Sequence, residues 1–316
     1  MRFVRARTDQ GLRVGVLDHE GTVTLSSDES ALEPYFGDNG DALTALGGRI
    51  LAAAAGEQPL DDLELVRPVD PPSLRDFMVF EQHATPSWRA RGLETGPDIW
   101  FHQPVGYFSN AANLLGPRDG IEIPGGSQRL DFELEIGAVV GREARSVTPD
   151  EAGAYLAGYL ILCDWSARDV QFREMDGQLG PFKGKDFASS LGPVFVTPDE
   201  LGGYRNGTGF DLKMTASVNE RVYGSDVWSS AYWSFEELIS YASWNSRVEP
   251  GALIGSGTCQ GGCILELSLR HGPGNYPYLV ADDRVTLTVD TLGEICSTVT
   301  ASSRGPWPGY RERPDR

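Results

Sequence analysis

Long apolar segments are missing from this chain of 316 residues. The longest uninterrupted runs lie at 50–55 and 159–163 and are far shorter than the roughly 20 residues that cross a bilayer. The first ten residues, MRFVRARTDQ, also lack the apolar stretch of a secretory signal. We therefore expect a cytoplasmic protein that does not bind membranes.

Basic charge and cysteine are scarce as well. The 27 Lys and Arg residues are outnumbered by 45 Asp and Glu residues, which gives a net charge of −18. Nucleic acids bind through clustered Lys and Arg, so this balance argues against a nucleic-acid partner. Four cysteines are too few for a disulfide scaffold, and Cys259 and Cys263 lack the second pair or nearby histidine of a zinc site. We predict that all four cysteines are free, buried thiols.

Two common catalytic signatures are also absent. There is no G-x-S-x-G turn, which argues against a serine hydrolase. No G-x-G-x-x-G follows a predicted strand, which argues against a dinucleotide-binding fold.

Short segments with period-2 alternation dominate what is present. They lie at 130–141, 192–196, 210–219, 264–269 and 284–289. Three capping boxes, beginning at Thr148, Thr197 and Ser234, predict helix starts. Because strands outweigh helices and Gly-rich turns join many of them, we predict an α+β fold that is mainly β, a sandwich or roll with a few peripheral helices.

The chain divides at a Pro-rich connector over 66–73. Residues 1–66 are predicted to form a small N-terminal β domain, with a helix from about 41 to 55. Residues 67–316 are predicted to form the larger domain, and its tail, 303–316, has no periodicity and should run over the surface.

The segment 130–136 alternates apolar and acidic residues. On a strand, Asp131, Glu133 and Glu135 share one face at spacings of about 7 Å. This face is either solvated at a sheet edge or neutralised by a cation. Asp164, directly after an apolar run, adds a fourth carboxylate and favours the cation. An all-oxygen set suits hard ions, so we expect Mg²⁺ first, with Mn²⁺ or Ca²⁺ as alternatives.

Together with several other segments, these residues give the sequence a resemblance to the fumarylacetoacetate hydrolase family. The matching blocks occur in the family's order at 71–84, 102–108, 130–137, 163–171, 179–187, 218–226 and 249–258. The resemblance implies a mixed β-sandwich roll with a small N-terminal β domain, assembled as a homodimer. It also implies a divalent cation that binds a small β-diketo or 2-oxo acid.

The resemblance assigns roles to individual positions. The implied metal ligands are Asp76, Glu133, Glu135 and Asp164. The implied catalytic residues are His83 as general base, Glu266 as its partner, and Lys185 and Gln171, which stabilise the departing carbanion. The implied substrate contacts are Tyr107, Thr258 and an arginine, Arg91 or Arg89, of which we favour Arg91.

Simpler interpretations of several of these residues stay open at this point. His83 could lie on an ordinary helix face, Glu266 on the solvent face of a strand, and Tyr107 in the core. Arg168 and Asp169 are expected to pair and hold a turn.

Three functions compete. The first is a metal-dependent hydrolase that cleaves a carbon–carbon bond of an acylpyruvate or fumarylacetoacetate-like acid with water activated by His83. The second is a lyase or isomerase (decarboxylase, hydratase or tautomerase) that uses the same ion to stabilise an enolate. It is favoured by Met175, which stands where fumarylacetoacetases have a tyrosine. The third is a binding protein that retains only the fold.

Overall fold

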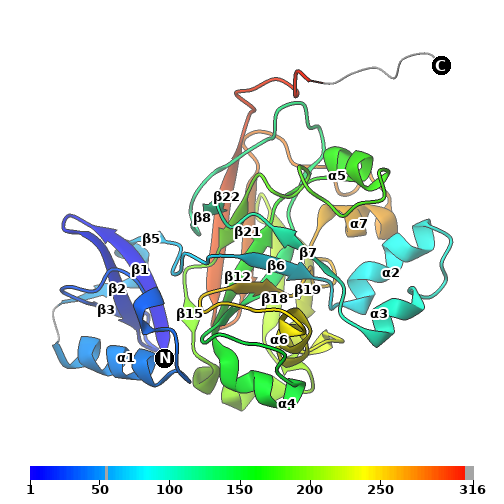
Figure 1. Ribbon diagram of the computed structural model, residues 1–316. Coiled ribbons are helices and arrows are strands. Elements are labelled where there is room, and N and C mark those ends of the chain that lie inside the picture. Colours follow the sequence, from blue (N-terminus) through cyan, green and yellow to red (C-terminus); the bar gives the residue numbers. More distant parts are fainter. Residues whose placement is uncertain (54–55, 310–316) are drawn as a thin grey trace.

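The computed structural model describes residues 1–53 and 56–309 (Figure 1). Its strands are β1 Arg2–Thr8, β2 Gly11–Leu17, β3 Thr22–Leu25, β4 Glu57–Pro59, β5 Glu64–Val66, β6 Leu74–Phe77, β7 Gly106–Ser109, β8 Leu114–Leu115, β9 Ile121–Glu122, β10 Leu130–Asp131, β11 Leu134–Val140, β12 Leu156–Asp164, β13 Ser166–Ala167, β14 Ser189–Leu191, β15 Phe195–Val196, β16 Arg205–Asn206, β17 Gly209–Phe210, β18 Lys213–Val218, β19 Arg221–Val227, β20 Leu253–Gly255, β21 Arg284–Val289 and β22 Gly293–Thr300. Its α-helices are α1 Asp41–Ala53, α2 Glu81–Ala90, α3 Asp98–His102, α4 Pro149–Ala152, α5 Arg168–Met175, α6 Phe235–Ser243 and α7 Ile264–His271. Short 3-10 turns are η1 Glu33–Tyr35, η2 Leu60–Asp62, η3 Gly153–Tyr155, η4 Pro198–Tyr204 and η5 Trp228–Ser230.

Two sheets form the body of the protein. The larger one runs in the order β4-β3-β2-β1-β15-β12-β11-β20-β6-β7, with β5, β8 and β14 paired beside this path. The smaller one runs β19-β18-β21-β22-β9. Strands β11 and β12 contact β18, β21 and β22, so the two sheets face each other. The mainly β sandwich with peripheral helices is therefore confirmed.

The centre of the large sheet is unusually apolar because both of its faces are covered. Every residue of β11 and β12 is buried. One face packs against the small sheet, and on the other Phe3, Leu160 and Leu253 share a cluster with α1. Strands of this kind hold the polar side chains at their ends in fixed positions.

The N-terminal strands lie at one side of the molecule, with α1 beneath them (Figure 1). They form the expected meander, in which β1 pairs with β2 and β2 with β3. Strand β1 also pairs with β15, so hydrogen bonds run continuously from this unit into the large sheet. The predicted helix over 41–55 is observed as Asp41–Ala53, and its last two predicted positions lie outside the described residues.

Three local predictions need correction. The segment 264–269 is not a strand but the start of α7, because Asp131 accepts the free N–H groups of Ile264 and Leu265 at the helix N-terminus. The strand predicted over 130–141 is interrupted between β10 and β11. The box at Thr197 does not form, because the Thr197 hydroxyl binds the amino terminus of Met1 instead. The boxes at Thr148 and Ser234 are confirmed.

Two further predictions concern the membrane and the tail. Within the described ranges, no helix has both the length and the apolar character that a membrane span requires. Residues 303–309 of the tail are exposed, as expected, and 310–316 fall outside the described residues.

Candidate active site

Three carboxylates meet where neighbouring strands of the large sheet end. Asp76 lies on β6, Glu135 on β11 and Asp164 on the last position of β12. All three side chains are buried, and each offers an oxygen within 4.8 Å of the others. Hydrogen bonding along the strands fixes this placement, because β12 pairs with β11 and β20 pairs with both β11 and β6.

Two glycines make room for this carboxylate group. Gly255 on β20 pairs directly with Asp76, and a Cβ there would lie 2.3 Å from Asp76 Oδ1. Gly257 has a φ of +75°, which favours glycine, and its N–H donates to Asp76 Oδ1 (3.2 Å) and Glu135 Oε2 (3.1 Å). The GSG turn therefore shapes the site with backbone atoms.

Burial sets the protonation of these acids. It raises the pKa of Asp164 to about 7, against the opposing effect of the Lys185 charge and with a smaller contribution from the charge of Asp76. Burial, together with the charges of Asp76 and Asp164, also raises the pKa of Glu135 well above its ordinary value. The pKa of Asp76 is raised by burial too. Without a cation, the group holds protons that it would release on binding one.

The fourth predicted ligand, Glu133, lies in a different environment. Arg168 Nη2 donates to Glu133 Oε1 at 2.7 Å, and Lys185 Nζ donates to Glu133 Oε2. Burial alone would raise the pKa of Glu133, but Arg168 and Lys185 outweigh it and hold that pKa far below the usual range. Lys185 also donates to Asp164 Oδ2 at 2.5 Å. Lys185 thus bridges Glu133 to the three-carboxylate group, and the role of Glu133 as a ligand stays a prediction.

His83 and Glu266 form a hydrogen-bonded pair. His83 lies on α2, and its Nδ1 is 3.0 Å from Oε2 of Glu266 on α7. Glu266 is buried and also accepts from the Gly261 N–H (2.8 Å) and from Arg270 Nε (2.6 Å). Because this carboxylate accepts from every neighbour, His83 Nδ1 carries the proton and Nε2 is left free to accept one.

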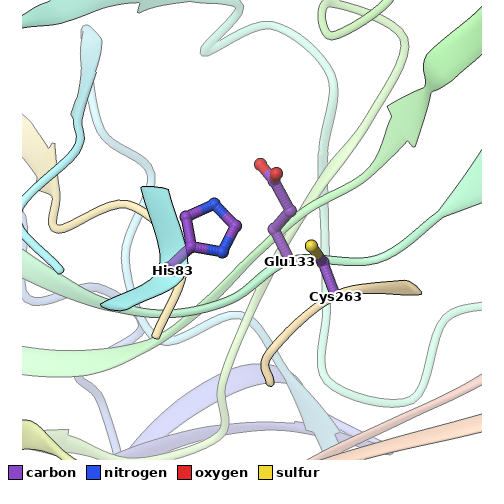
Figure 2. A group of neighbouring side chains, drawn as sticks. All are labelled: His83, Glu133 and Cys263. Atoms are coloured by element: carbon purple, nitrogen blue, oxygen red, sulfur yellow. The ribbon is translucent and has the colours of Figure 1, made fainter. Parts of the chain in front are cut away.

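A second group of side chains has the spacing of a metal site. His83, Glu133 and Cys263 offer donor atoms within 4.8 Å of one another (Figure 2). Two cations already hold Glu133, and burial raises the pKa of the Cys263 thiol well above its ordinary value. A thiolate ligand is therefore disfavoured here, and Figure 2 shows His83 beside the Glu133 carboxylate and the Cys263 thiol. The prediction that all four cysteines are free and buried is confirmed.

A cavity of about 240 Å³ opens onto these groups. Nine predicted site residues line it, namely Asp76, His83, Arg91, Tyr107, Glu133, Glu135, Gln171, Lys185 and Thr258. The other two, Asp164 and Glu266, contact lining residues from behind. The Tyr107 hydroxyl lies within hydrogen-bond distance of Asp76 Oδ2 (2.9 Å) and Asp164 Oδ2 (2.5 Å) and can donate to either, so Tyr107 is not simply a core residue.

Arg168 was misjudged from the sequence. It does not pair with Asp169, which instead accepts from Ser127 Oγ and the backbone N–H of Gln128. The buried Arg168 guanidinium binds Asp131, Glu133 and Gln171. The spacing of Arg168 from its neighbours could have indicated its place in the site. One face of a helix would carry residues 168, 171, 172 and 175, and all four line the cavity.

The residues present suit a divalent cation of the hard, oxygen-preferring kind. Among the described residues, Glu135 Oε1 and Asp164 Oδ1 are buried side-chain oxygens without a hydrogen-bond partner. Such atoms are costly unless an ion or water occupies the space between them. The carboxylate group of Asp76, Glu135 and Asp164 therefore fits a hard divalent cation.

Comparison with known proteins gives matches over most of the chain. The family model for the fumarylacetoacetate (FAA) hydrolase C-terminal domain matches residues 75–300. Fumarylacetoacetase from Oryza sativa subsp. japonica is 27% identical over 331 residues, which covers 87% of this chain and 74% of the rice protein.

Two solved structures share the fold. A fumarylacetoacetate hydrolase from Exiguobacterium antarcticum superposes with a TM-score of 0.71 at 21% identity, covering 96% of this chain and all of that one. A 2-hydroxyhepta-2,4-diene-1,7-dioate isomerase from Mycobacterium marinum does so with a TM-score of 0.67 at 21% identity, with the same coverage of both chains.

Proposed function

The chain belongs to the fumarylacetoacetate hydrolase family, and from this premise we propose that it is a divalent-metal-dependent hydrolase of the carbon–carbon bond in a small β-diketo acid. The observation that carries the proposal is the position of the His83–Glu266 pair on the same cavity as Asp76 and Glu135. A base and a cation site on one cavity are the two elements that hydrolysis requires.

The cation would be held by Asp76, Glu135 and Asp164, with Glu133 as a further ligand if Lys185 gives way. When bound, it would chelate the dicarbonyl, polarise the carbonyl under attack and stabilise the enolate that leaves. Mg²⁺ is the first candidate, and Mn²⁺ or Ca²⁺ are alternatives.

His83 Nε2 accepts a proton from water, and Glu266 stabilises the imidazolium that forms. The hydroxide oxygen adds to the acyl carbonyl carbon. The bond from that carbon to the neighbouring carbon then breaks, which leaves the acyl fragment as a carboxylic acid, and its electron pair leaves with the oxo acid fragment as an enolate. The proton held by His83 passes to the enolate carbon and gives the neutral oxo acid fragment, so one water is consumed and His83 regains its starting form.

Polar side chains around the cavity serve the departing fragment. Arg168 Nη1 donates to Gln171 Oε1 (3.0 Å), which leaves the Gln171 amide N–H groups free to donate to substrate oxygens. Lys185 adds a buried positive charge, and its pKa is raised because Asp164 and Glu133 outweigh the effect of burial. Thr258 lies beside Gly257 on the cavity wall, and Arg91 lines the cavity where α2 ends. We assign Thr258 and Arg91 to substrate carboxylate or carbonyl groups.

The test is turnover of acylpyruvates and fumarylacetoacetate-like acids by purified protein with Mg²⁺ or Mn²⁺. Wild type is expected to release two acid fragments, while Glu135→Ala and His83→Ala do not. Calorimetry separates the two roles, because His83→Ala should still bind the ion and Glu135→Ala should not. Turnover by wild type no faster than by Glu135→Ala would refute the proposal for that panel.

The alternative is a lyase or isomerase that forms the same enolate without attack by water. Met175 lines the cavity and supplies an apolar side chain instead of a phenol, which supports this alternative. Product analysis decides between them. Release of CO₂ or an intact, rearranged carbon chain would indicate a lyase or isomerase.

A non-catalytic binding protein is disfavoured because base and ligand candidates are present together. Loss of activity in His83→Ala with unchanged binding of Mg²⁺ would exclude it.

A further inference from the structure

Helix α2 carries His83 and is attached to the rest of the protein in two ways. Its last turn is held by an apolar cluster, in which the rings of Trp88 and Trp100 pack edge to face at 5.3 Å. Its first turn, next to His83, is held by a polar contact from α7. Arg270 Nη2 donates to the backbone carbonyl of Gln82.

That carbonyl is available because of Pro86. In an α-helix, the Gln82 carbonyl accepts the N–H of residue 86. Pro86 lies inside α2 and has no N–H, so the helix itself leaves this acceptor without its usual partner. Arg270 supplies a donor to this carbonyl from a different helix.

The same guanidinium also holds the partner of His83. Arg270 Nε donates to Glu266 Oε1 at 2.6 Å, and Glu266 Oε2 faces His83 Nδ1. The carboxylate of Glu266 is 1% exposed, whereas an ordinary surface pair of this spacing would be exposed on both sides. One side chain therefore contacts the backbone beside the base and the acid that orients the base.

We propose that Arg270 is a positioning residue. It docks α2 onto α7 through the carbonyl that Pro86 frees, so that His83 and Glu266 are assembled before substrate enters. The docking claim rests on these contacts alone, and its effect on rate rests on the proposed function.

The test compares Arg270→Gln and Arg270→Lys with wild type and with Arg145→Gln. Arg145→Gln is the control. It removes an exposed arginine that pairs with Glu143, and neither residue lines the cavity. Amide hydrogen exchange over 81–90 is expected to accelerate roughly tenfold or more in Arg270→Gln, because a charge-assisted hydrogen bond to the first turn of α2 is lost. Arg270→Lys is expected to recover part of this protection, since an ammonium can serve one of the two acceptors.

Kinetics and calorimetry supply the readouts that a merely structural role would not move. In Arg270→Gln, kcat is expected to fall roughly tenfold to a hundredfold with a smaller change in KM, since orientation of the base affects the transition state most. Binding of Mg²⁺ should stay within about twofold of wild type, because Arg270 does not contact the carboxylates that would hold the ion.

The part played by Pro86 is tested with a double-mutant cycle. Pro86→Ala restores an N–H for the Gln82 carbonyl, so removal of Arg270 in that background should accelerate exchange less than in wild type. Equal acceleration in the two backgrounds, or unchanged exchange over 81–90 in Arg270→Gln, would overturn the proposal. If wild type turns over none of the acids, the proposed function fails while the exchange experiments still decide on the docking.

Discussion

Replacing one carboxylate of the buried group with an amide should remove its contribution to the pH dependence of stability. Burial raises the pKa of Asp164 from 3.8 to about 7, and this shift of about 3 units corresponds to about 4 kcal/mol. Between pH 4 and 7 the unfolded chain has released this proton and the metal-free native protein retains it. Native protein then binds more protons than unfolded protein, so Asp164 makes the free energy of unfolding fall as pH rises through this window.

Asp164→Asn removes this dependence because the amide does not titrate. In EDTA, the free energy of unfolding of the variant relative to wild type is expected to rise by about 4 kcal/mol between pH 4 and 7, then level off. Saturating Mg²⁺ should reduce this difference, since wild type gains about 2.7 kcal/mol at a concentration of 100 Kd and the variant lacks one ligand. Urea denaturation at pH 4 to 8, with and without Mg²⁺, measures both effects.

The matched control is Asp9→Asn, which neutralises an exposed aspartate in the turn between β1 and β2. It should shift the free energy of unfolding by less than about 0.5 kcal/mol, and Mg²⁺ should stabilise this variant as much as wild type. A difference between Asp164→Asn and wild type that stays constant from pH 4 to 8 would refute the inference that burial strains these acids. Equal stabilisation of both proteins by Mg²⁺ would show that Asp164 is not a ligand.

Three other predictions follow from the same contacts. Lys185→Met leaves the buried Asp164 carboxylate without its cation and should lower the free energy of unfolding by about 3–5 kcal/mol in urea denaturation. Lys183→Met removes a lysine that is 61% exposed and should lower it by less than about 1 kcal/mol. Gly255→Ala places a Cβ 2.3 Å from Asp76 Oδ1 and should weaken Mg²⁺ binding by roughly tenfold or more by calorimetry; Gly48→Ala, where a Cβ meets nothing within 4 Å, should leave binding unchanged. A thiol reagent should label the four cysteines at a useful rate only after unfolding, and rapid labelling of native protein would contradict their burial.

Much of the site was visible in the sequence because its residues lie at positions with strong local signals. Glu133 and Glu135 alternate with apolar residues in a segment that must be extended, and Asp164 follows a buried strand. The resemblance to a known family then added residues such as His83 and Lys185, which local patterns could not single out.

Tertiary contacts decided between strand and helix where the period-2 pattern of a short segment fitted both. A run as short as 264–269 fits strand and helix equally well, and Asp131, more than 130 residues earlier, selects the helix by accepting its first N–H groups. Because Glu266 lies in the first turn of this helix, the same contact with Asp131 helps to place Glu266 beside His83. Likewise, Arg168 has an acidic neighbour in sequence but binds two carboxylates from the strand segment at 131–133.

The sequence by itself thus determined the mainly β class, the free cysteines and the acidic segment, because each depends on composition or on neighbours a few residues apart. Only the tertiary structure showed that Asp76, Glu135 and Asp164 converge while Glu133 is held by cations. It also showed that Arg270 joins the carbonyl freed by Pro86 to the partner of His83. These contacts depend on which strands and helices become neighbours in the fold. Charge and burial act through distances in space, and the positions of residues along the chain do not give those distances.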